Sequence, residues 1–208
     1  MSSETSSSDT SSTFLVARRI SDIGNAMTFS LILAILLSFG TRQVFAPWLV
    51  FVLSFLIMVF GPAALLVGGM KAGKIDFDVS DQKIRTPFYL IIEGFYFAGL
   101  VVFSRAVMPS WALFNVAIVS VVLNGLLLVI NFKWKISAHA AGAAGPAAGI
   151  AFVFGWWTLF IMVPVVIAII WSRLYLKKHT LGQLIAGTIF AVAVYSAVFV
   201  GIYPLALF

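Results

Sequence analysis

Two short stretches in the second half of the chain hold both of its histidines. The first reads Ser-Ala-His over residues 137–139, and the second reads Ser-Arg over residues 172–173, followed after five residues by His179. Each histidine lies near a hydroxyl and a basic residue, at the edge of a long apolar run. Polar groups beside a membrane-spanning segment are costly, so such a cluster calls for a functional explanation.

Histidine and arginine are residue types that can carry out phosphoryl transfer. That reaction needs a nucleophile in line with the leaving group and donors around the equatorial oxygens. His179 would attack phosphorus as a neutral imidazole and form a phosphohistidine. His139 would protonate the departing oxygen and then activate water, while the forked donors of Arg173 match phosphate oxygens.

Composition places the elements around these residues in a membrane. The chain has 208 residues, of which 62% are hydrophobic and only 10% charged, and its mean hydropathy is +1.11. Soluble domains carry roughly 25% charged residues. With no cysteine, disulfides, thiolate zinc sites and cysteine nucleophiles are excluded. The net charge of +6 comes from basic residues at the ends of apolar runs, which does not indicate nucleic-acid binding.

The apolar runs predict an all-α polytopic helical bundle with six to seven transmembrane segments. The charge-free run from 136 to 172 would exceed about 50 Å as one helix, so we expect two spans with a turn near residues 155–158. Residues 1–20 are expected to form a disordered Ser/Thr-rich tail and residues 21–208 the membrane domain. The expected spans are residues 23–41, 43–70 with a kink at Pro62, 86–104, 106–132, the two within 136–172, and 181–203.

Counting crossings brings the polar sites to one end of the bundle. Arg85, His139 and His179 each follow an even number of spans, so all three should emerge on the same face as the N-terminus. That face also carries all the basic residues except Arg42 and Arg105. Positive-inside bias predicts a cytoplasmic orientation for this face, in the cell membrane.

The two histidine stretches resemble the second and third signatures of the type 2 phosphatidic acid phosphatase superfamily, which includes lipid phosphate phosphatases and vanadium haloperoxidases. In the second signature, usually Pro-Ser-Gly-His, Ile136 and Ala138 replace Pro and Gly. In the third, Gln183 stands where the family has Asp. The first signature, Lys-x6-Arg-Pro, is matched only by Arg85 with a proline nearby, and Asp78 takes the place of its lysine. Together, Lys-Ile-Ser-Ala-His and His-Thr-x-x-Gln resemble a recurrent prokaryotic variant, over roughly residues 71–190.

The resemblance implies a metal-independent lipid phosphatase that uses no cofactor. Its substrate would be phosphatidic acid, phosphatidylglycerol phosphate or a polyprenyl diphosphate, and its partners only the lipid substrate and the bilayer. Lys135 would supply the charge of the missing lysine, with Lys74 and Lys83 as alternatives. The implied site has His179, His139 and Gln183 as catalytic residues and Arg85, Lys135, Ser137, Ala138 and Arg173 as phosphate ligands.

Gln183 should act on His179 directly. Residues four apart face one another on a helix, so the Gln183 carbonyl can orient the imidazole through Nδ1–H. Unlike an aspartate, it brings no charge. The substitution therefore predicts a His179 that is less basic but still active.

Other interpretations of the same residues stay open. Asp76, Asp78 and Asp81 could bind Mg²⁺ in a membrane phospho- or prenyl-transferase. The departures at Asp78 and Gln183 also suit a catalytically silent lipid-binding or scaffold protein. Glu93 lies inside a span and is left out of the site, because it can equally pair with a neighbouring polar group. The asparagines are expected to form interhelical hydrogen bonds: Asn115, Asn124 and Asn131.

Overall fold

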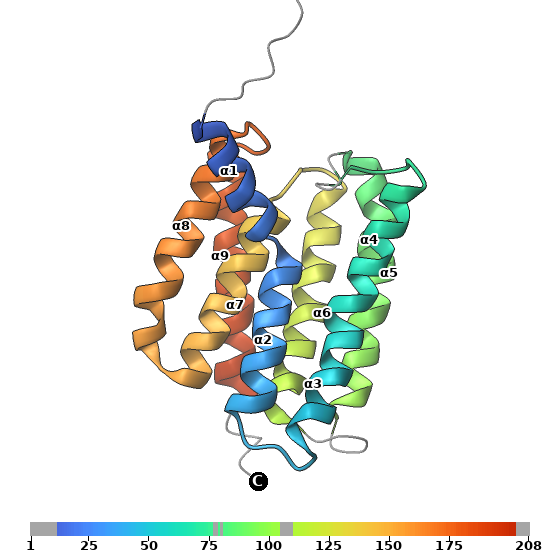
Figure 1. Ribbon diagram of the computed structural model, residues 1–208, viewed down its shortest axis with the longest axis vertical. Helices are drawn as coiled ribbons and strands as arrows, with labels where there is room; N and C mark the ends of the chain where they lie inside the picture. Colours follow the sequence, from blue (N-terminus) through green and yellow to red (C-terminus); the bar gives the residue numbers. More distant parts are fainter. Residues whose placement is uncertain (1–11, 77–78, 80, 105–109, 203–208) are drawn as a thin grey trace, which may run out of the picture.

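The computed structural model describes residues 12–76, 79, 81–104 and 110–202 (Figure 1). These residues form helices and short connections without strands, which confirms the all-α class. A π-helical turn, Leu56–Phe60, joins α3 to α4, and a 3-10 turn, Trp156–Thr158, precedes α8. The α-helices are α1 (Ser12–Ile23), α2 (Ala26–Gly40), α3 (Pro47–Phe55), α4 (Gly61–Lys71), α5 (Gln82–Val102), α6 (Trp111–Asn131), α7 (Ala138–Phe154), α8 (Leu159–Tyr175) and α9 (Leu181–Ile202).

Several of these helices are long and apolar enough to cross a membrane. By length and composition the described residues hold five candidate spans, or six if α1 and α2, bent by 50°, count as one. The sequence predicted six to seven. The counts differ because α7 ends before Gly155 as expected but has only 17 residues, and because α2, with 15, counts only together with α1. The five spans are Pro47–Lys71, Lys83–Val102, Trp111–Asn131, Trp156–Tyr175 and Leu181–Gly201.

The N-terminal segment differs from the expected tail. Residues 12–23 form α1, so the predicted boundary at residue 21 falls inside a helix, while residues 1–11 lie outside the described part. Asn25 separates α1 from α2, because its side-chain oxygen accepts from Met27 N (2.9 Å) and Thr28 N (3.1 Å). The first apolar span therefore begins at Ala26 rather than at residue 23.

The predicted kink at Pro62 takes the form of a wider helical turn. Proline has no N–H to donate into the preceding turn, which disturbs the regular hydrogen-bond ladder. Here Leu56–Phe60 is π-helical and Pro62 lies in the first turn of α4. The stretch from Pro47 to Lys71 remains one candidate span.

α7 lies among α2, α8 and α9 and carries the second signature at its first turn (Figure 1). Its small residues allow this central position. A Cβ at Gly145 would lie 2.5 Å from the Tyr195 ring of α9, and one at Gly149 would lie 2.8 Å from the same ring. The spacing Gly145-x3-Gly149 therefore allows α7 and α9 to pack closely.

α5 and α6 are joined by polar side chains. Asn124 donates to the Tyr89 carbonyl at 3.0 Å and to the Glu93 carboxylate. Asn131 lies 3.5 Å from a threonine hydroxyl of α5. The interhelical role expected of these two asparagines is confirmed, and Glu93 has a structural partner. Asn115 is buried as well, but no hydrogen-bond partner for its side chain appears in the described part of the chain.

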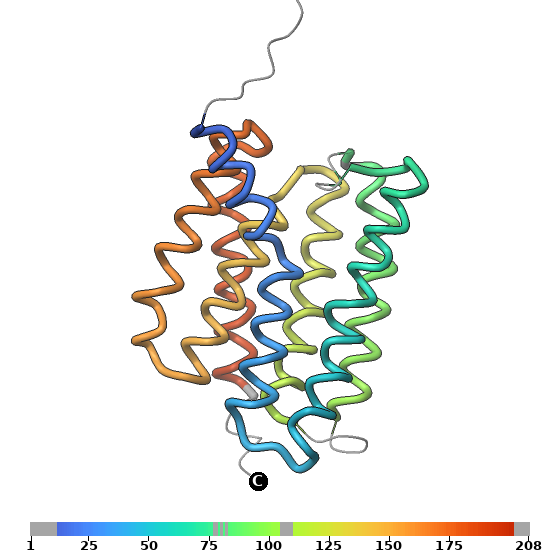
Figure 2. Tube along the Cα trace, viewed as in Figure 1, coloured from blue at the N-terminus to red at the C-terminus, as the bar shows by residue number. Residues whose placement is uncertain are grey.

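The connections that precede α5, α7 and α9 share one end of the bundle (Figure 2). Following the tube in Figure 2, the chain reverses at one end of the bundle between α4 and α5, between α6 and α7, and between α8 and α9. α1 lies at that same end (Figure 2). The three signatures, although far apart in sequence, therefore begin or end at one end of the molecule.

Candidate functional site

The connection from α8 to α9 fixes the spacing between Arg173 and His179. The N–H of Lys178 donates to the Arg173 carbonyl at 3.1 Å, and that of Lys177 to the Leu174 carbonyl at 3.0 Å. Lys177 has a φ of 52°, in the left-handed region. These bonds are a Schellman cap, which ends α8 and turns the chain back toward the bundle. The next residue after Lys178 is His179.

α9 then begins with a reciprocal cap. The Thr180 hydroxyl accepts from Gln183 N at 3.4 Å, and the Gln183 side-chain oxygen accepts from Thr180 N at 3.0 Å. The same Gln183 oxygen lies 3.2 Å from Nδ1 of His179. Because an amide oxygen only accepts, this contact assigns the proton of neutral His179 to Nδ1 and leaves the lone pair on Nε2. The predicted contact between His179 and Gln183 is present.

His179 is held in its neutral form. Its side chain is buried, with 7% exposed. Burial, together with the positive charges of Arg173 and Arg85, lowers the pKa of His179 to about 4, although the Gln183 hydrogen bond opposes this. The prediction of a less basic His179 agrees with this direction, with burial as the largest cause. The imidazole therefore keeps its lone pair at neutral pH.

The second signature starts α7 and is joined to the third. Ser137 is the N-cap of α7, and its hydroxyl accepts from Ala140 N at 3.3 Å. Its own N–H donates to the Gln183 carbonyl at 3.3 Å. A Cβ at Gly187 would lie 2.6 Å from the Ser137 carbonyl oxygen, so only glycine lets α9 approach α7 this closely.

Arg85 comes from the first turn of α5. Asp81 caps this helix by accepting from Lys83 N at 2.8 Å. The buried Arg85 guanidinium donates from Nε to the Val79 carbonyl at 2.6 Å, and its Nη1 lies 3.5 Å from the Ile136 carbonyl. Arg85 thus lies against the residue that precedes Ser137. Asp78, at the place of the family's lysine, lies outside the described residues.

The lysines considered for the missing charge differ in burial. Lys135 is half-buried, whereas Lys74 and Lys83 are exposed. Burial and the charges of Arg85, Lys178 and Arg173 lower the pKa of Lys135. The positive charge of Lys135 also contributes to lowering the pKa of His179. Lys135 therefore belongs to one cluster with Arg85, Arg173 and His179.

Arg173 lies at the end of α8 and is almost completely buried, with 1% exposed. Its Nη1 donates to the Ser21 hydroxyl of α1 at 2.7 Å. A buried guanidinium requires polar partners. Here the Ser21 hydroxyl is such a partner, although Ser21 is 152 residues away in sequence. No sequence pattern pointed to Ser21, because the contact is purely tertiary.

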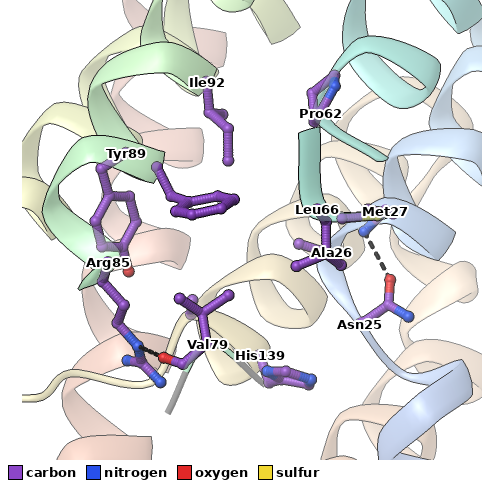
Figure 3. Close-up of a pocket in the computed structure, with 12 residues that line it drawn as sticks. Asn25, Ala26, Met27, Pro62, Leu66, Val79, Arg85, Tyr89, Ile92 and His139 are labelled. Carbon is purple, nitrogen blue, oxygen red and sulfur yellow. Dashed lines mark hydrogen bonds between the residues drawn. The ribbon is translucent and has the colours of Figure 1, made fainter. Parts of the chain in front are cut away.

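A cavity of about 150 Å³ lies beside Arg85 and His139. Figure 3 shows Arg85 and His139 toward one end of this cavity and Ile92 and Pro62 toward the other. Ala138 lines it next to His139. His139 and Ala138 are thus on the cavity side, whereas His179 lies at the start of α9. Arg85 connects the two, because it lines the cavity and its charge acts on His179.

The acidic loop before α5 is only partly described. Asp76 is exposed, and Asp81 uses its carboxylate to cap α5. No group of three or more metal-binding side chains occurs among the described residues, which leave out Asp78. The loop residues that can be seen therefore add nothing to the magnesium interpretation.

Thr180, although part of the His-Thr-x-x-Gln stretch, has a capping role that was not predicted. The pattern Thr-x-x-Gln before an apolar run is a capping signal that could have identified it.

No protein-family model matches this chain, and searches of the curated proteins and of the solved structures found no match.

Proposed function

We propose that the protein is an integral membrane phosphatase that hydrolyses a phosphomonoester or diphosphate of a lipid through a phosphohistidine on His179. The observation that supports this most is the environment of His179. Its imidazole is buried, oriented by Gln183 and subject to the charges of Arg173 and Arg85. A nucleophilic lone pair beside fixed cations suits attack on an anionic phosphorus centre.

The reaction would take two steps. In the first, Nε2 of His179 bonds to phosphorus while the P–O bond to the lipid breaks, and His139 donates a proton to the departing oxygen. In the second, His139 takes a proton from water, the water oxygen bonds to phosphorus and the N–P bond breaks. Inorganic phosphate leaves and both histidines are restored. The other cations, Arg85, Arg173 and Lys135, would stabilise the charge on the non-bridging oxygens.

A lipid substrate is favoured over a soluble one by the cavity beside Arg85 and His139. Its other walls include Phe88, Ile92 and Leu66, so an anionic headgroup and an apolar chain would each have a suitable surface. Phosphatidic acid, phosphatidylglycerol phosphate and polyprenyl diphosphate all have this combination. No cofactor takes part in the proposed steps.

Phosphate release from these three lipids by the purified full chain tests the proposal. We expect His179→Ala to abolish release. Lys177→Gly is the matched control, because it removes an exposed cation of the same loop and suits the φ of 52°. Equal release by wild type and His179→Ala would contradict the proposed mechanism. Release should persist in EDTA; loss in EDTA and recovery with Mg²⁺ would favour the transferase interpretation.

We also propose that the end of the bundle with the signatures faces the cytoplasm, on the basis of its excess of basic residues. The chain has no cysteine, so single-cysteine variants can be labelled selectively. In intact cells, an impermeant maleimide should label Arg42→Cys but not Lys74→Cys. The reverse pattern would place the site outside.

A further inference from the structure

We infer that Ser21 is a positioning residue of the candidate site, and that its hydroxyl fixes the orientation of the Arg173 guanidinium for binding an oxyanion. This inference rests on the proposed function. Nη1 of Arg173 donates to Ser21 Oγ at 2.7 Å, and both residues are 1% exposed. A hydrogen bond to a charged group is strong when water is excluded from it. α1 lies outside residues 71–190, which carry the family resemblance.

The packing of α1 on α8 holds this hydroxyl in place. Ala17 and Ser21 are buried residues of α1, four apart and therefore on one face. Gly24 continues this face: a Cβ there would lie 2.5 Å from Ile169 of α8. Ile169 precedes Arg173 by four residues and lies on the same face of α8. The same close contact that joins the two helices therefore sets the Ser21–Arg173 distance.

The orientation of Arg173 matters for two properties of the site. A planar guanidinium binds phosphate oxygens well only in the correct plane, and an arginine side chain has many rotamers to lose. The charge of Arg173 also contributes to keeping His179 neutral. Without Ser21, the guanidinium would lose its α1 partner and reorient. We therefore expect weaker binding of phosphate-like anions together with slower turnover.

The test compares Ser21→Ala, Ser21→Thr and a control in the purified full chain. Ser54→Ala is the matched control, because Ser54 is equally buried but donates only to the Phe51 carbonyl of its own helix, α3. The readouts are KM and kcat for a lipid phosphate and the dissociation constant of tungstate, a phosphate mimic. Ser21→Ala should weaken tungstate binding and raise KM by about tenfold. Ser21→Thr keeps the hydroxyl and should recover most of the affinity, and Ser54→Ala should match wild type.

A double mutant separates positioning from simple helix packing. If Ser21 acts through Arg173, then adding Ser21→Ala to Arg173→Lys should change tungstate binding little further. A packing role alone would lower the melting temperature of Ser21→Ala without changing the tungstate affinity of the folded protein. That result, or additive losses in the double mutant, would overturn the inference. Should Ser21→Thr fail to fold, the alanine variant and the double mutant still decide.

The outcomes also distinguish this inference from the proposed function. If wild type hydrolyses lipid phosphates and Ser21→Ala equals it in KM and tungstate affinity, only the role of Ser21 is wrong. If no variant hydrolyses any substrate but Ser21→Ala still weakens tungstate binding, the role of Ser21 stands and the phosphatase proposal fails. If wild type does not bind tungstate at all, both are wrong.

Discussion

The most informative perturbation is Gln183→Glu, which adds one negative charge with almost no change of shape. The Gln183 oxygen lies 3.2 Å from Nδ1 of His179, and glutamate can make the same reciprocal cap with Thr180. The pKa of His179 is lowered to about 4 in the native protein. An opposite charge at hydrogen-bond distance favours the protonated imidazole and raises such a pKa by about one to three units.

The acid limb of the pH–rate profile should report this change. Because the nucleophile must be neutral, wild-type kcat/KM should fall only near pH 4, where His179 takes up a proton. In Gln183→Glu the fall should begin at a pH about one to three units higher, while activity at pH 8 changes little. With two histidines in the chain, NMR titration with a His139→Gln variant for assignment would measure the same shift directly.

Thr180→Ala is the matched control for loss of the cap. It removes the 3.4 Å bond to Gln183 N but adds no charge, so it should lower the melting temperature and leave the acid limb in place. An acid limb that stays in place, or moves to lower pH, in Gln183→Glu would refute the reasoning. Either residue 183 would not contact the nucleophile, or the titrating group would not be His179.

Two further predictions concern stability. As the pH falls from 6.5 to about 4, the unfolded chain binds a proton at His179 that the folded protein does not, so wild type should lose up to about 3 kcal/mol of stability. His179→Gln should lose less over this window in thermal unfolding, and an identical pH dependence would contradict the lowered pKa. Gly187→Ala should separate α9 from α7, since its Cβ would lie 2.6 Å from the Ser137 carbonyl oxygen. We expect a lower melting temperature and lower activity than in Gly125→Ala, where a Cβ has open space; similar values for the two variants would show that the approach is not tight.

The sequence was sufficient to predict the features that depend on hydropathy and on the number of membrane crossings. Apolar runs predicted the helices, and an even number of crossings predicted that Arg85, Ser137 and His179 share one end of the bundle. The six to seven expected spans and the five to six candidate spans of the described residues agree only at six. The turn expected near residues 155–158 is present at Gly155, but hydropathy does not reveal α1, the helix that Asn25 separates from α2.

The tertiary partners of the signature residues were not predictable in the same way. The local i, i+4 rule was enough for the contact between His179 and Gln183. One partner of Arg173 is Ser21, on a helix where the sequence predicted a disordered tail followed directly by a span. No periodicity links two residues so far apart. The contact between Arg85 and Ile136 was not predictable either, because it involves the backbone carbonyl of Ile136 and not its side chain.

The geometry gives a reason why glutamine at position 183 is compatible with a working site. Gln183 caps α9 through Thr180, orients His179 and accepts from Ser137 N through its own carbonyl, so it joins two signatures. Being neutral, it leaves the positive charges acting on His179 without compensation at that position. A carboxylate there would stabilise the imidazolium. The neutral amide leaves the lone pair on Nε2 and does not neutralise the cations, which stay available to attract an anionic ligand. The proposed site thus combines a weakly basic nucleophile with strong attraction for a highly charged phosphate, two properties that an aspartate would have moved in opposite directions.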